Sequence, residues 1–309
     1  MNKKGVEFSF NWIFAIIVGA VILFLAIFFA TRIISTGRYG VDTELAKELA
    51  IITNPLETGF AESRSQLIDL KLETRIYNDC SDRGNFGKST ISATTKSGIG
   101  KEWEKPGAGI DLANKYIFSS SVEQGKELFA FSKKFNFPFY VSDLITMSSK
   151  SYCFINPPYN IENEILDLNI ENVKIQGIDN CTLQDIEVCF EENCEISVRS
   201  FSGNYEAGEV IKEDGSVVFV NELIYPAIFS DKEIYECNLK RLMKRVSQIC
   251  SVYRDESEII KDKCSSGIEA DLESLRISSL NLNSSSQIVG IYGQAELLEL
   301  RQNPSCEVF

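Results

Sequence analysis

Hydrophobic residues are unevenly distributed along the chain, and the densest run lies close to the N-terminus. From Trp12 to Ala30 the sequence is WIFAIIVGAVILFLAIFFA, which contains no charged residue. A helix of this length, at about 1.5 Å per residue, extends about 28 Å, close to the hydrocarbon thickness of a bilayer. A helix also satisfies its backbone hydrogen bonds internally. The pattern therefore predicts one membrane-spanning helix over residues 12–34.

The helical pattern continues after this run, but with an expected break. Residues 33–52 suit a helix, and Ser35-Thr36-Gly37 is expected to interrupt it. Asp42 is a suitable N-cap for a second piece. The sequence thus predicts a separate juxtamembrane stalk helix over residues 35–56.

The next stretch favours β-structure. Residues 66–76 alternate strictly, and one face of the expected strand carries Ile68, Leu70, Leu72, Thr74 and Ile76. Further strands are predicted at 89–95, 173–178, 186–190 and 196–198, with a hairpin at 210–220 and a short helix at 161–168.

Three phenylalanines also alternate, at Phe135, Phe137 and Phe139. Two interpretations follow from this spacing. The residues form a buried core strand, or they form an exposed aromatic strip that binds a ligand or partner.

From residue 230 the hydrophobic period changes to that of an amphipathic helix. One face carries Tyr235, Leu239, Leu242, Met243, Val246, Ile249, Cys250 and Tyr253. Cys237 lies nearly opposite Cys250, so each must reach a different element. The outer face also carries a basic patch, formed by Lys240, Arg241, Lys244 and Arg245. This patch is either a solvated helix face or a surface for anionic lipid heads or an acidic neighbour.

Together these patterns predict an α+β fold with strands first and helices last, stabilised by disulfides. The expected organisation begins with a cytoplasmic tail (1–11), a transmembrane helix (12–34) and a stalk helix (35–56). A β-rich extracytoplasmic region (57–225) follows, and an α-helical C-terminal region (226–309) packs on it.

Charge and composition narrow the function classes. The 309 residues carry a formal net charge of −13, which disfavours nucleic acid as a partner. The chain contains no histidine, which excludes Ser-His-Asp triads, Cys-His dyads and imidazole metal sites. We expect no cofactor and assign no catalytic, cofactor-binding or metal-binding residue.

Nine cysteines follow the apolar run, and none forms a C-x-x-C pair. They are Cys80, Cys153, Cys181, Cys189, Cys194, Cys237, Cys250, Cys264 and Cys306. Disulfides in an oxidising compartment are the favoured interpretation, and the odd count leaves at least one thiol outside an intrachain pair. The alternative is a metal bound by Cys181, Cys189 and Cys194 with a fourth thiolate.

The cysteines also decide the expected orientation. Lys3 and Lys4 before the helix are nearly balanced by Arg32 and Arg38 after it, so the positive-inside comparison is close to a tie. An exterior domain suits the thiols better than a reducing cytosol does. The sequons Asn180-Cys181-Thr182 and Asn283-Ser284-Ser285 agree with this placement. We expect a single-pass protein of the cell membrane with its C-terminal domain outside the cytoplasm.

Lys3-Lys4-Gly5 directly before an apolar helix resembles the class III signal of archaeal type IV pilin-like proteins. The resemblance covers about the first 35 residues. It implies cleavage after Gly5 and a helix that both anchors the subunit and packs the core of a filament. Glu7 would be the second residue after such a cut, whereas the family usually carries glutamate at the fifth. A plain signal-anchor is the alternative.

Three function classes follow. The first is a membrane-anchored structural or interaction protein of the cell envelope, pilin-like in one version, with partners in the bilayer and self-association or protein binding through the membrane helix. The second is an anchored ligand-binding or sensing domain with residues 129–140 as the wall of an apolar pocket. The third is a hydrolase using paired carboxylates or a Ser-Lys dyad, although an enzyme is the less expected class.

Overall fold

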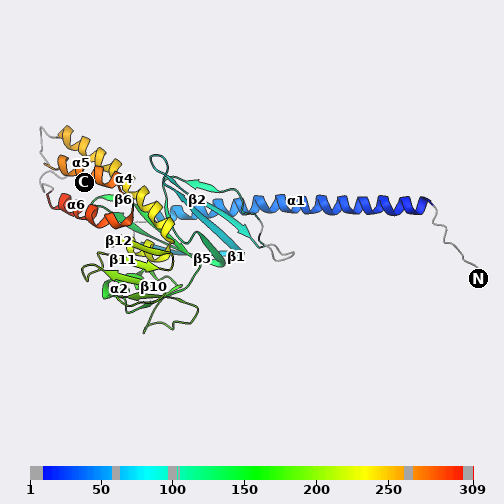
Figure 1. Ribbon diagram of the computed structural model, residues 1–309, viewed down its shortest axis with the longest axis horizontal. Helices are drawn as coiled ribbons and strands as arrows, with labels where there is room; N and C mark the ends of the chain where they lie inside the picture. Colours follow the sequence, from blue (N-terminus) through cyan, green and yellow to red (C-terminus); the bar gives the residue numbers. More distant parts are fainter. Residues whose placement is uncertain (1–9, 58–62, 97–102, 104, 261–266, 302–308) are drawn as a thin grey trace, which may run out of the picture.

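A computed structural model describes residues 10–57, 63–96, 103, 105–260, 267–301 and 309. The chain folds as an α+β domain with one long helix projecting from it (Figure 1). The helices are α1 Phe10–Glu57, α2 Tyr159–Leu168, α3 Ile224–Phe229, α4 Lys232–Ile260, α5 Glu269–Leu280 and α6 Ile288–Arg301, with 3-10 turns η1 Asn221–Leu223 and η2 Ser285–Gln287.

The strands form two six-stranded sheets. The first sheet has the order β3-β2-β1-β5-β6-β4 and the second has the order β12-β11-β10-β9-β7-β8. The bounds are β1 Ser63–Ser81, β2 Lys88–Thr95, β3 Ile110–Leu112, β4 Tyr116–Phe118, β5 Val122–Asn136, β6 Tyr140–Ser148, β7 Tyr152–Ile155, β8 Val173–Ile175, β9 Ile186–Phe190, β10 Ile196–Ser200, β11 Ala207–Lys212 and β12 Gly215–Val220.

The first sheet separates two hydrophobic cores. One face packs on the C-terminal half of α1, through a cluster that includes Leu49, Ile68, Ile91 and Leu128. The other face contributes Phe118, Phe131 and Phe135 to a larger core shared with the second sheet and with α3 to α6. Helix α4 packs on strands of both sheets. The molecule is therefore layered as helix, sheet, helices and second sheet.

Several local predictions are confirmed because the periodicity that produced them is local. The hairpin at 210–220 forms as β11 and β12, and Gly215 occupies the turn with a φ of 122°. Strands β2 and β9 and helix α2 lie where they were expected. The face of α4 that carries Tyr235, Leu242 and Cys250 is buried.

The prediction that Ser35-Thr36-Gly37 interrupts the first helix is wrong. Helix α1 runs without interruption for 48 residues, through Ser35, Thr36 and Gly37. Asp42 is not an N-cap but lies inside this helix, buried against the first sheet. The segment predicted to span the membrane and the predicted stalk are thus one continuous helix, because packing on the sheet supports the second half.

The alternation in β1 is confirmed with one exception. Ile68, Leu70, Thr74 and Ile76 are buried, but Leu72 is 57% exposed. The pairing with β5 shifts register between Asp69 and Thr74, so the strand bulges at Leu72 and turns that side chain outward.

The three alternating phenylalanines are buried, which confirms the core interpretation and removes the exposed strip. They do not form one strand, however. Strand β5 ends at Asn136 and β6 begins at Tyr140, so Phe137 lies in the connecting turn. Its ring packs against Phe135 and Tyr292, which places the turn over the core.

Candidate functional site

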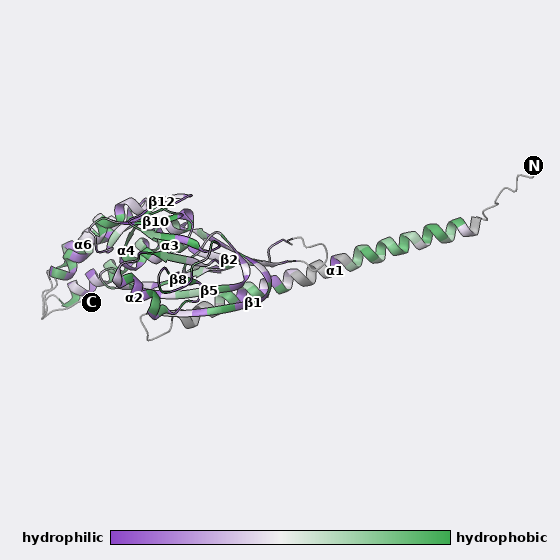
Figure 2. Cartoon of the chain, turned by 90° about the horizontal axis from the view of Figure 1, so that it is seen from below, coloured by the Kyte–Doolittle hydropathy of each residue, from purple (hydrophilic) through white to green (hydrophobic). Residues whose placement is uncertain are grey.

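The N-terminal half of α1 makes no buried contact with the domain. The span Trp12–Ala30 has a mean hydropathy of 3.1, and none of it is buried in the structure. Large apolar side chains such as Trp12, Phe24 and Phe29 are more than half exposed to the surroundings. Figure 2 shows this uncovered apolar segment extending away from the domain. Its length and composition suit a bilayer crossing, and a signal sequence near an N-terminus has the same features.

The C-terminal half of the same helix is joined firmly to the first sheet. Ala46 and Leu49 are buried in the interface. The Asp42 carboxylate accepts hydrogen bonds from the Thr95 backbone N–H at 3.1 Å and from the Thr95 hydroxyl at 2.9 Å. Asp42 is only 1% exposed. Because a buried carboxylate requires partners, these bonds fix the helix relative to β2.

A second contact on α1 depends on the absence of a side chain. The Thr43 hydroxyl accepts a hydrogen bond from the Ala108 backbone N–H at 3.0 Å. A Cβ atom added at Gly107 would lie 2.6 Å from the Thr43 backbone nitrogen. Glycine at 107 therefore permits the loop before β3 to lie directly on the helix.

The candidate processing site, Gly5, lies outside the described residues, as do Lys3 and Lys4. Cleavage after Gly5 stays a prediction.

Six of the seven cysteines that the structure describes form disulfides. Cys80 pairs with Cys237, Cys153 with Cys181, and Cys189 with Cys194. Cys250 is buried and unpaired, and burial raises the pKa of its thiol to about 12. Cys264 and Cys306 lie outside the described residues. Cys237 does reach a different element, β1, through its bond to Cys80, whereas Cys250 forms no disulfide with any described residue.

The pairing weighs against the metal alternative for Cys181, Cys189 and Cys194. Glu187, Cys189 and Cys194 do place possible ligand atoms within 4.8 Å of one another. The two sulfurs are bonded to each other, however, so neither is a thiolate. Cys181 is bonded to Cys153 on β7.

The basic patch on α4 is not a free helix face. Arg241 is fully buried beneath the β1–β2 connection. Its guanidinium donates hydrogen bonds to Ser89 Oγ at 2.7 Å, to Asn238 Oδ1 at 2.7 Å and to the carbonyl oxygens of Phe86, Leu112 and Ala113. Its Cζ atom also lies 4.9 Å from the centroid of the Tyr116 ring.

The other members of the patch are only partly exposed. Lys244 donates to the carbonyl oxygens of Asp82 and Gly84. Arg245 donates through Nε to the Val141 carbonyl at 2.7 Å. Lys240 is half-buried. Sequence periodicity missed this arrangement because the partners lie more than 100 residues away along the chain.

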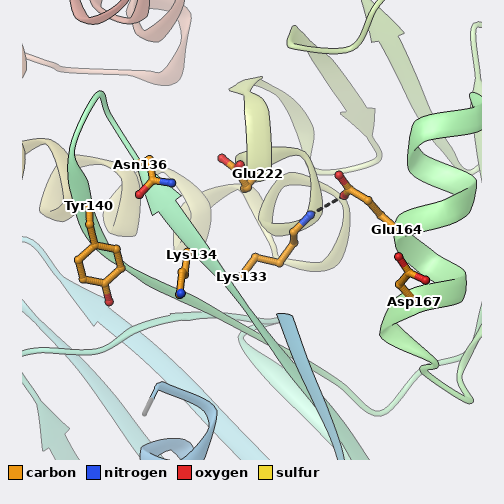
Figure 3. A pocket seen from close by; sticks show the side chains of 7 residues that line it. All are labelled: Lys133, Lys134, Asn136, Tyr140, Glu164, Asp167 and Glu222. Atoms are coloured by element: carbon orange, nitrogen blue, oxygen red, sulfur yellow. Dashed lines mark hydrogen bonds and ion pairs between the residues drawn. The ribbon is translucent and has the colours of Figure 1, made fainter. Parts of the chain in front are cut away.

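A polar hollow of about 740 Å³ lies beside the segment proposed as a pocket wall. Figure 3 shows its lining, in which Lys133 of β5 faces Glu164 of α2 and the two form an ion pair. Tyr225 donates a short hydrogen bond of 2.5 Å to the same Glu164 carboxylate. Burial raises the pKa of Glu222, which also lines the hollow. This lining is charged, whereas the ligand-binding alternative called for an apolar pocket.

The structure also brings one serine and one lysine together. Lys150 Nζ lies 3.1 Å from Ser120 Oγ, at a hollow between the two sheets that Lys212 also lines. An acyl-transfer site needs free backbone N–H donors near the nucleophile. Here the Ser120 N–H is bonded to Glu123 and the Ser121 N–H to Asp231. The pair is therefore a structural contact rather than a nucleophile with an oxyanion hole.

Comparison with known proteins gives no relative. No family model, curated protein or solved structure matches the chain.

Proposed function

We propose that this chain is a membrane-anchored structural or interaction protein of the cell envelope, of the pilin-like type, with its disulfide-linked domain outside the cytoplasm. The observation that carries the proposal is the division of α1 into two halves. One half is apolar and uncovered, and the other is built into the domain.

This division suits a subunit whose position depends on its membrane helix. A plain signal sequence is removed from the mature protein, so it has no need to be continuous with a helix of the folded domain. In this chain the helix continues directly from the apolar span to Leu49, which is part of one hydrophobic core, and to Asp42, which is hydrogen-bonded to Thr95 of the first sheet.

The uncovered span also offers a surface for self-association. Small residues recur four positions apart at Ala15 and Gly19 and at Ala26 and Ala30. Such spacing allows membrane helices to approach closely. The placement outside the cytoplasm is supported by the three disulfides, which persist in oxidising compartments.

Two measurements test the proposal on the full chain in its own cells. Mass spectrometry of the mature N-terminus should find a chain that begins at Val6. A membrane-impermeant amine reagent should label domain lysines such as Lys126 in intact cells. An intact Met1 contradicts the pilin-like version, and labelling of the domain only after lysis contradicts the exterior placement.

A further inference from the structure

One sequon lies on a surface that the proposed function leaves unexplained. Asn180-Cys181-Thr182 occupies the segment between β8 and β9, which is neither helix nor strand. Asn180 and Thr182 are both exposed. We propose that Asn180 is an N-glycosylation site, and this inference rests on the exterior placement proposed above.

The segment around Asn180 is held in place at three points. Cys181 is bonded to Cys153 of β7. The Asp179 carboxylate accepts a hydrogen bond from the Ile175 backbone N–H at 2.9 Å. Asp185 accepts hydrogen bonds from the Thr182 backbone N–H and hydroxyl and from Lys174. The sequon is thus held on the surface, where the enzyme that transfers an oligosaccharide to asparagine can reach it.

The apolar side chains that flank the sequon are uncovered. Ile178 is 55% exposed, and Leu183 is fully exposed. Both residues lie within three positions of Asn180 in the chain, so the surface next to the attachment point is not charged on every side.

A hollow of about 340 Å³ opens directly beside Asn180, between α2 and β8. Asn169, Glu171 and Asp179 line it and offer hydrogen-bonding groups for sugar hydroxyls. The attachment point therefore adjoins a hollow with polar groups that sugar hydroxyls can contact.

The second sequon of the chain provides an internal comparison. In Asn283-Ser284-Ser285 the final serine is only 3% exposed. Its hydroxyl donates to Glu236 at 2.6 Å and accepts from the Val218 N–H at 3.0 Å. Both sequon hydroxyls are hydrogen-bonded, but Thr182 is exposed whereas Ser285 is buried inside the fold, so modification is assigned to Asn180 and not to Asn283.

The reaction is a group transfer from a lipid-phosphate-linked oligosaccharide. The Asn180 Nδ2 atom forms a bond to the anomeric carbon of the first sugar and gives up one proton to a base of the transferase. The bond between that carbon and the phosphate oxygen breaks, and the lipid phosphate leaves with the electron pair.

Peptide mapping of the full chain purified from its own cells tests this inference. The peptide containing Asn180 should be heavier by whole sugar residues, and chemical deglycosylation should return it to the mass of the sequence. The Asn180→Gln and Thr182→Ala variants should lose the added mass completely. Thr182→Ser should keep it, and Asn283→Gln should leave it unchanged.

Three results overturn the inference. The first is an unmodified Asn180 in a chain whose lysines are labelled from outside the cell, which leaves the exterior placement intact. The second is sugar at Asn283 instead. The third is an unmodified Asn180 in a chain labelled only after lysis, which removes the exterior placement as well. Mapping of the Cys153–Cys181 disulfide in each variant shows that the loop has folded.

Discussion

At the scale of single residues, two buried polar side chains join parts of the chain that lie far apart in sequence. Arg241 links α4 to the first sheet and its loops through four hydrogen bonds, to Phe86, Ser89, Leu112 and Ala113, and donates a fifth to Asn238 of α4 itself. Asp42 links α1 to β2. Each is stable inside the fold only because its charge is hydrogen-bonded, so the removal of either side chain leaves buried groups without partners.

The Asp42→Ala variant should be destabilised by about 1–3 kcal/mol, because the Thr95 N–H and hydroxyl would lose their acceptor in a buried interface. Urea unfolding of the full chain in detergent measures the change. Asp42→Asn keeps one acceptor oxygen and should lose less. Glu44→Ala, at an exposed position on the same helix, is the matched control and should stay within about 0.5 kcal/mol of the parent. Equal stability of the Asp42→Ala variant and its control would show that this contact does not hold the helix.

At the scale of elements, the disulfides differ in the length of chain that they close. Cys80–Cys237 joins β1 to α4 across 157 residues, whereas Cys153–Cys181 and Cys189–Cys194 close 28 and 5 residues within the second half of the domain. A crosslink restricts the unfolded chain more when the loop that it closes is longer. The Cys80–Cys237 pair, which joins the first sheet to α4, is therefore the disulfide on which stability depends most.

Paired Cys→Ser variants should follow that order. Loss of Cys80–Cys237 should cost about 5 kcal/mol by loop entropy, and loss of Cys189–Cys194 about 2 kcal/mol. Urea midpoints under identical non-reducing conditions give the ranking, and the Cys250→Ser variant serves as a control for cysteine replacement itself. A larger loss for Cys189–Cys194 than for Cys80–Cys237 would contradict the entropic account.

At the scale of the whole molecule, the chain divides at the middle of α1 into an apolar rod and a layered domain. The described part of the rod, Trp12–Ala30, has no buried residue, whereas the packed half lies on one face of the first sheet and contributes Leu49 to the core there. The proposed membrane attachment and the packing of the domain thus involve different parts of one helix.

Two truncations separate these roles. A chain that begins at Tyr39 keeps Asp42, Ala46 and Leu49, and should fold in water without detergent and form the same three disulfides. A chain that begins at Ser63 lacks all of α1 and exposes Ile68, Ile91 and Leu128, so it should aggregate or bind a hydrophobic dye. Gel filtration, dye binding and disulfide mapping distinguish the two. A soluble, correctly paired chain from Ser63 would show that the packed half of α1 is dispensable for folding.

Sequence reasoning succeeded where the relevant neighbours are close in the chain. The alternation before Ile76, the hairpin at Gly215 and the buried face of α4 all follow from periodicity within one element. It failed where distant partners changed the outcome. The bulge opposite β5 turned Leu72 outward, and carbonyl groups from another layer buried Arg241. The polar hollow at Lys133 and Glu164 carried no sequence signal, because its lining comes from separate elements.

The sequence by itself determined the apolar span at Trp12–Ala30, the α+β composition and the surplus of cysteines, since hydropathy, period and residue type are properties of the chain alone. Only the tertiary structure decided that α1 is continuous, which cysteines pair, that Arg241 lies inside, and that one sequon is open while the other is closed. The physical reason is that each of these depends on contacts between segments brought together by folding, and burial can reverse what an isolated residue prefers.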